Sequence, residues 1–143
     1  METEHAVRRP AVAGIFYSGT HAELQTEVED LLRDAAAPAV AGTLIALIVP
    51  HAGYMYSGAT AAKAYALIQG RTIDTCVLVG PSHQEYFQGI SVYPGSAYET
   101  PLGQIDIDAD LRADLLSRST VVHASMQGHR GEHSLEVQLP FLQ

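Results

Sequence analysis

The sequence predicts an α/β fold with a mainly parallel central sheet. The first observation is the apolar run Leu44–Val49, which contains β-branched residues and ends abruptly at Pro50-His51. A second run, Thr75–Val79, ends in the same way at Gly80–His83. Continuous apolar runs of this length are typical of strands that are buried on both faces, as in parallel sheets. The alanine-rich stretch Ala59–Ile68 lies between them, so the three elements predict a right-handed βαβ unit.

Length and composition predict a single domain over residues 1–143. Hydrophobic residues make up 47% of the chain and charged residues 17%, which separates it from disordered proteins. The net charge is -8 and only 8 residues are Lys or Arg, which argues against nucleic acids and anionic membranes as partners. The N-terminus carries no apolar signal segment, and no apolar run approaches the roughly 20 residues of a membrane span. We therefore expect a cytoplasmic protein with no membrane or nucleic-acid partner.

The first 43 residues predict an extended segment followed by a helix. Residues 1–17 are apolar in their second half but contain proline and glycine, so we expect an extended segment that covers a sheet edge or the core. Thr20–Glu23 has the form of a capping box, which predicts that a helix begins there. The helix should end at Pro38 and Gly42, before the first strand. Its expected buried face is a single apolar stripe: Leu24, Val28, Leu31 and Leu32.

The region after Val79 predicts shorter elements. Half-exposed strands are expected at Ile90–Tyr93, Gln104–Ile107 and Val121-Val122. The segment Tyr98–Gly103 is expected to be a loop. Asp108 is placed to cap a short helix. The segment Leu135–Leu142 fits either a strand or a helix, because its alternation favours a strand whereas Pro140 is awkward in a central strand.

His51 and His83 each follow one of the two predicted buried strands. Ligands bind beyond the carboxyl ends of strands in open α/β sheets, and neighbouring strands lie about 4.7–4.9 Å apart. Both imidazoles could therefore reach one metal ion at about 2.0–2.1 Å. Imidazole suits iron, copper and zinc alike, and a third ligand such as a carboxylate would be needed. The alternative is that each residue is a hydrogen-bonded loop histidine after a proline turn.

A third polar cluster is centred on Glu132 and His133. On a helix Glu132 and Glu136 would share a face, which could orient a histidine or hold a cation, and a solvated helix start is an equal alternative. Tyr54 and Tyr56 could line a pocket or donate a proton to an oxygen intermediate, although packing is the more frequent role of tyrosine. The other histidines are expected on the surface or in loops: His5, His21, His123 and His129.

Other catalytic motifs are not supported. The single cysteine, Cys76, lies within the second apolar run, which predicts a buried and inert thiol. The glycines form neither a dinucleotide-binding nor a P-loop motif, and the serines do not lie in a G-x-S-x-G motif.

Five motifs, in this order, resemble the Memo family: Arg9–Tyr17, Pro50–Gly58, Gly80–His83, Thr100–Gly103 and Glu132–Glu136. Prokaryotic members of that family are called AmmeMemoRadiSam system protein B. The family is similar in fold to the class III, LigB-type extradiol dioxygenases, which are non-haem iron enzymes that open catechol rings. The resemblance implies a three-layer α/β sandwich with a mainly parallel central sheet and a helix after His133.

By that resemblance His51 and His83 correspond to two histidine metal ligands, with iron as the expected divalent metal and copper or zinc as alternatives. We assign His133, which would line the cleft, and Tyr54 as candidate catalytic residues.

The family pattern continues beyond the motifs found here. Its second half carries the third metal position, often a cysteine in Memo proteins and a glutamate in the dioxygenases, and Cys76 lies in a different motif. We therefore expect the chain to be the N-terminal, truncated part of a longer pattern, with an incomplete site that is inactive alone. An open sheet edge would be covered by an oligomer partner or by the remaining half of the chain.

Two functions stay open at this point. The first is a metal-binding Memo-like protein with redox activity, related to the extradiol dioxygenases, that takes a small-molecule or peptide ligand in its cleft. The second is a non-catalytic peptide- or ligand-binding scaffold with a vestigial dioxygenase-like site. A weaker third is a metal-dependent hydrolase, which would need an activated water and a carboxylate base.

Overall fold

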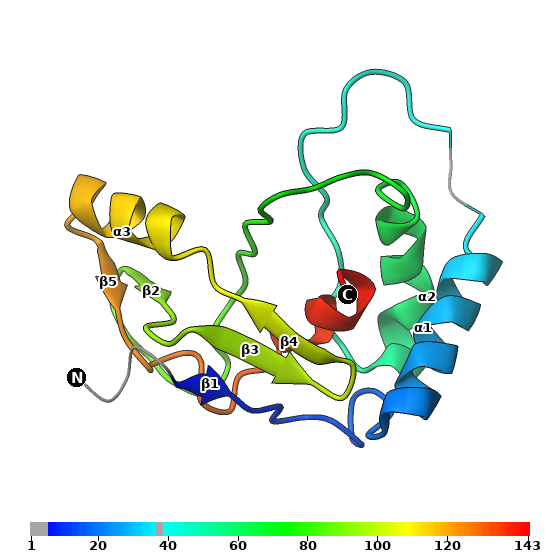
Figure 1. The fold of residues 1–143 in the computed structure, drawn as a ribbon, viewed down its shortest axis with the longest axis horizontal. Helices are drawn as coiled ribbons and strands as arrows, with labels where there is room; N and C mark the ends of the chain where they lie inside the picture. The colour runs from blue at the N-terminus through cyan, green and yellow to red at the C-terminus, as the bar shows by residue number, and fades with distance from the viewer. Residues whose placement is uncertain (1–5, 37–38) are drawn as a thin grey trace.

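The computed structural model describes residues 6–36 and 39–143 (Figure 1). The helices are α1 (His21–Asp34), α2 (Tyr54–Tyr65), α3 (Ala109–Arg118) and the 3-10 helix η1 (Glu136–Phe141). The strands are β1 (Val7–Arg8), β2 (Ile90–Val92), β3 (Ala97–Thr100), β4 (Gly103–Asp106) and β5 (Val122–Ala124). In one sheet β1 pairs in parallel with β3, which pairs antiparallel with β4, and in a second sheet β2 pairs in parallel with β5. The predicted α/β class is confirmed.

Helix α1 begins at the predicted capping box. The Thr20 hydroxyl accepts the Glu23 backbone N–H at 3.4 Å and donates to the Glu23 carboxylate at 2.7 Å. The helix ends at Asp34, before both predicted stop residues. Of these two, Pro38 lies outside the described residues. Gly42 follows with a left-handed φ of 93°, a conformation that favours glycine.

Helix α2 begins at Tyr54, five residues before the predicted start at Ala59, because Gly53 already serves as its N-cap. It packs against α1 rather than against a sheet, and the two helices lie side by side in Figure 1. The close approach needs a small residue, since a Cβ atom at Gly58 would lie 3.0 Å from Cδ1 of Leu31. The alanine-rich composition therefore supports close packing between two helices.

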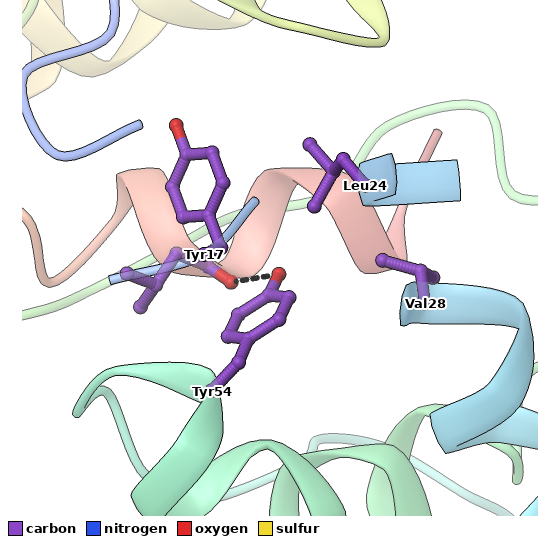
Figure 2. Packing of buried hydrophobic residues seen from close by; sticks show 5 residues of the cluster. Tyr17, Leu24, Val28 and Tyr54 are labelled. Atoms are coloured by element: carbon purple, nitrogen blue, oxygen red, sulfur yellow. Dashed lines mark hydrogen bonds between the residues drawn. The ribbon is translucent and has the colours of Figure 1, made fainter. Parts of the chain in front are cut away.

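The hydrophobic core lies where η1 contacts α1 and α2. One buried cluster contains Tyr17, Leu24, Val28, Tyr54 and Val137. Figure 2 shows four of these side chains beside η1, with the Tyr54 hydroxyl donating to the Val137 carbonyl at 2.8 Å. The segment with two open interpretations is thus helical, in agreement with the family resemblance.

Local sequence signals place most of the small elements correctly. The strands β2, β4 and β5 lie at the predicted positions or within two residues of them. The Asp108 carboxylate accepts the Leu111 backbone N–H at 2.8 Å and caps α3 as predicted. The N-terminal segment covers a sheet edge through β1, also as predicted. Strand β3 was missed, because the sequence assigned most of it to the loop Tyr98–Gly103.

The two apolar runs predicted as central strands form no strand. Ile45 and Ile48 are 93% and 101% exposed, and Val77 and Val79 are 66% and 90% exposed. Within the described part of the chain, no backbone group of residues 44–49 or 75–79 bonds to another backbone group. A strand buried on both faces needs partner strands and covering layers, and the described residues supply neither to these runs. The predicted βαβ unit is therefore wrong for these residues.

Cys76 is exposed, so the prediction of a buried thiol is wrong, because its segment is not covered. Over the described ranges, none of the helices combines the length and the apolar character that crossing a bilayer requires.

Candidate functional site

Three histidines from different parts of the chain converge beside the start of η1. The ring centroids of His51 and His83 lie 5.2 Å apart, and those of His83 and His133 lie 4.7 Å apart. The third separation, between His51 and His133, is 6.0 Å. The convergence predicted for His51 and His83 is therefore present, and the third polar cluster contributes to the same place.

The turn that opens η1 brings these residues together without a sheet. Gln138 donates its side-chain N–H to the Pro50 carbonyl at 3.2 Å, one residue before His51. The Ser134 hydroxyl donates to the Pro81 carbonyl at 2.7 Å, two residues before His83. One short segment thus holds both histidine-bearing loops by the carbonyls of their prolines.

Glu132 is the central hydrogen-bond acceptor of the site. Its Oε1 lies 2.9 Å from Nδ1 of His83 and accepts the backbone N–H groups of His133 and Ser134, each at 2.9 Å. Its Oε2 accepts the backbone N–H of His83. The carboxylate is buried, whereas the His83 side chain is 40% exposed. Of the alternatives open from the sequence, orientation of a histidine is thus the role that these contacts favour for Glu132.

The electrostatics of the site favour an ionised Glu132 carboxylate and a neutral His133 imidazole. Burial alone would raise the pKa of Glu132. The hydrogen bonds from His83, Ser134 and His133 lower it by a larger amount, so the resulting pKa is about 2. Burial lowers the pKa of His133, and the nearby His83 and His51 lower it too, although Glu132 acts in the opposite direction. Neutral imidazole is the form that binds metal ions.

A buried ion pair between Arg8 and Glu136 holds the segment from His129 to Glu136 in place. Arg8 pairs with Glu136, whose side chain is 0% exposed, and donates to the carbonyls of His129 and Glu132. Glu136 also accepts the Tyr17 hydroxyl at 2.6 Å. Sequence reasoning missed Arg8, for which the only signal was a charged residue beside an apolar segment. It considered Glu136 as a possible cation ligand, but the pair with Arg8 uses this carboxylate structurally.

The remaining predicted site residues lie elsewhere. Tyr54 is buried in the core with its hydroxyl bonded to Val137, so its position favours packing over a role beside the histidines. His129 lies in a turn, so the expectation of a surface or loop residue is met by its loop position; it is nevertheless buried, and its Nδ1 lies 2.6 Å from the Tyr98 hydroxyl. His5 lies outside the described residues.

The donor set fits a metal ion. Candidate ligand atoms of His83, Glu132 and His133 all lie within 4.8 Å of one another. For two imidazoles bound to one ion at about 2.0–2.1 Å, ring centroids should be roughly 4.5–5.2 Å apart at angles between octahedral and tetrahedral. The separation between His51 and His83 agrees with this estimate. The site can therefore hold a divalent ion, and nitrogen donors do not select among iron, copper and zinc.

All the residues of this site lie in a region that matches a known protein family. The family model described as "Memo-like protein" matches residues 8–143. A MEMO1 family protein of Metallosphaera sedula is 43% identical over 95% of this chain and 51% of its own length. A second, from Aquifex aeolicus, is 44% identical over 96% of this chain and 49% of its own length. The chain spans about half the length of the curated relatives it matches. Both the extent of the family match and the order of the motifs around the histidines lead to one conclusion: the chain belongs to the Memo-like family.

Proposed function

We propose that the chain carries the histidine half of a Memo-like metal centre, related to the non-haem iron extradiol dioxygenases and active in redox chemistry. His51 and His83 hold a divalent ion, iron in the first instance, with copper or zinc as alternatives. The observation that carries this proposal is the 5.2 Å separation of their rings at the ends of two loops that one segment anchors. A small molecule or a peptide is the proposed ligand of the cleft.

The protein's own residues have distinct tasks in this proposal. Glu132 accepts from Nδ1 of His83, which leaves the other ring nitrogen for the ion. His133 stacks on His83 with an interplanar angle of 15° and lines the site as a neutral imidazole that can accept a proton from a bound ligand. The ion would supply a Lewis acid and an open position for dioxygen. The third protein ligand is proposed to come from the part of the family pattern beyond these residues.

Metal binding is the first test. We expect the full-length form to bind one equivalent of Fe²⁺ or Zn²⁺ and its double variant His51→Ala, His83→Ala to bind none, measured by calorimetry and by metal analysis after dialysis. His21→Ala is the matched control, because His21 is an exposed histidine on α1 whose ring nitrogen lies 3.0 Å from the Pro101 carbonyl. Equal metal content in wild type and double variant would exclude the proposal.

A non-catalytic binding protein is the second candidate. It is favoured by the exposed side chains of Met55 and Tyr56, 83% and 79% accessible, which follow His51 on the first turn of α2 and offer an apolar surface to a peptide. Oxygen uptake with a panel of catechols separates the two functions. Oxygen consumption by the full-length form that disappears in its His51→Ala variant supports the redox function. Ligand binding by the full-length form without oxygen consumption supports the scaffold.

We also propose that the three-layer arrangement forms when further polypeptide, the remaining half or an oligomer partner, supplies strands to the two exposed apolar runs. The second run borders a hollow of about 1230 Å³ whose walls also include Ile105 and Leu139. Exposed apolar segments with free backbone groups are ready to pair with added strands. The three-layer sandwich of the dioxygenase-like fold would then be a property of the assembled protein.

A further inference from the structure

We propose that Glu132 is a positioning residue that holds His83 in the tautomer protonated at Nδ1, so that Nε2 is the metal-binding nitrogen. The inference deepens the proposed metal centre and rests on it for the identity of the ligand. It concerns the orientation of the imidazole before any ion arrives, so it can be tested separately. Glu132 is thereby distinguished from the residues that touch the ion.

The contacts between Glu132 and His83 restrict the imidazole in two ways. Oε2 of Glu132 accepts the backbone N–H of His83, and Oε1 lies 2.9 Å from Nδ1 of the same residue. Because an ionised carboxylate only accepts hydrogen bonds, the proton of the pair must lie on Nδ1. Rotating the ring by half a turn would point a carbon at Oε1 and lose this bond. Backbone and side chain of His83 are thus fixed to one carboxylate.

The same contacts argue against Glu132 as a direct ligand. Its Oε1 has two lone pairs and already faces three donors, the Nδ1 of His83 and the backbone N–H groups of His133 and Ser134. An ion bound there would have to displace them, and two of these donors belong to the backbone of the turn that opens η1. A ligating histidine, in contrast, usually donates its second ring N–H to a carboxylate.

The carboxylate itself is held in place. The Glu132 backbone carbonyl accepts from Arg8, whose guanidinium is fixed by the buried Glu136. The next two residues donate their N–H groups back to Glu132, and Ser134 is tied to Pro81. These contacts hold the Glu132 carboxylate in one position, so it can hold the His83 ring in one orientation.

The first experiment is on the metal-free wild-type chain. In ¹⁵N-labelled protein, long-range imidazole correlations distinguish a protonated Nδ1 from a protonated Nε2. At a pH where the ring is neutral, we expect the proton of His83 to lie on Nδ1 and not on Nε2. A His83 that is predominantly protonated at Nε2 in the folded wild type would overturn the proposal without any variant having to fold.

The second experiment compares two isosteric variants. Glu132→Gln keeps the shape but places an amide N–H among groups that all donate, so it should mix the His83 tautomers and weaken Zn²⁺ binding roughly 10- to 100-fold. Glu85→Gln is the matched control: Glu85 lies two residues after His83 but bonds Arg130 and the backbone of Gly128 instead of a histidine. The control should keep the wild-type tautomer and affinity.

The outcomes separate the two proposals. A wild type that binds no metal but holds His83 in the expected tautomer removes the metal centre and keeps the positioning role. A Glu132→Gln variant with wild-type tautomer and affinity removes the positioning role. X-ray absorption of the loaded wild type that requires a carboxylate oxygen absent from loaded Glu132→Gln would make Glu132 a ligand and also overturn it.

Discussion

Replacing Arg8 with alanine is expected to lower the free energy of unfolding by about 3–5 kcal/mol, the usual cost of leaving one partner of a buried ion pair alone. Glu136 is completely buried, and after the change the groups left to compensate its charge among the described residues would be the Tyr17 hydroxyl and the backbone N–H groups of Ala11 and Val12. Urea unfolding at pH 7, followed by circular dichroism, measures the effect.

Two further variants show whether the buried charge is the cause. Arg33→Ala removes an arginine whose pairs with Asp30 and Asp34 are exposed, so its effect should be far smaller. Adding Glu136→Gln to Arg8→Ala removes the uncompensated charge and should recover part of the loss. Similar destabilisation by Arg8→Ala and Arg33→Ala would contradict the structural role assigned to the pair.

Leu24→Ala is expected to cost about 2–5 kcal/mol, because it removes a fully buried side chain from the cluster between α1 and η1. The matched change Ile48→Ala should alter the stability of the same chain by less than about 0.5 kcal/mol, since Ile48 is fully exposed. Denaturant midpoints of the two variants provide the comparison.

The pair of variants also reports on where the core lies. If Ile48→Ala destabilised the chain as much as Leu24→Ala, residues 44–49 would be buried and the described core would be wrong. Hydrogen exchange gives an independent readout: amides of residues 44–49 and 75–79 should exchange rapidly in the chain alone and slowly once added strands cover them.

Local sequence signals predicted the parts of the fold that depend on neighbouring residues. The caps at Thr20 and Asp108 were predictable because a side chain and a backbone N–H two or three residues away satisfy each other within the same turn. The start of α2 was less accurate because Gly53 offers no side-chain cap. Strand β3 was missed because its flanking turn residues, with Pro101, are typical of a loop.

The predicted central strands show what local pattern cannot supply. The apolar composition of residues 44–49 and 75–79 indicates that they can be buried, but burial depends on partner strands elsewhere in a polypeptide. Ile48 and Val79 have none among the described residues and are exposed. The exposed position of Cys76 has the same origin.

The candidate site likewise contains residues that local sequence patterns reveal and partners that they do not. His51 and His83 could be found because each lies within four residues of the end of an apolar run, and the short polar motif marked Glu132 and His133. The partner of Glu132 could not be found, because His83 lies 49 residues away in sequence. Likewise, no periodicity indicates that Arg8, rather than the adjacent Arg9, should pair with Glu136.

The pair of Arg8 and Glu136 also has a consequence for synthesis. The two residues are separated by 128 positions, so at about 5–20 residues per second the arginine is incorporated roughly 6–26 s before its carboxylate exists. Until then the guanidinium that donates to the carbonyls of His129 and Glu132 lacks the carboxylate that holds it in place. The support that Arg8 gives to the turn beside the three histidines is therefore completed only after Glu136 has been made.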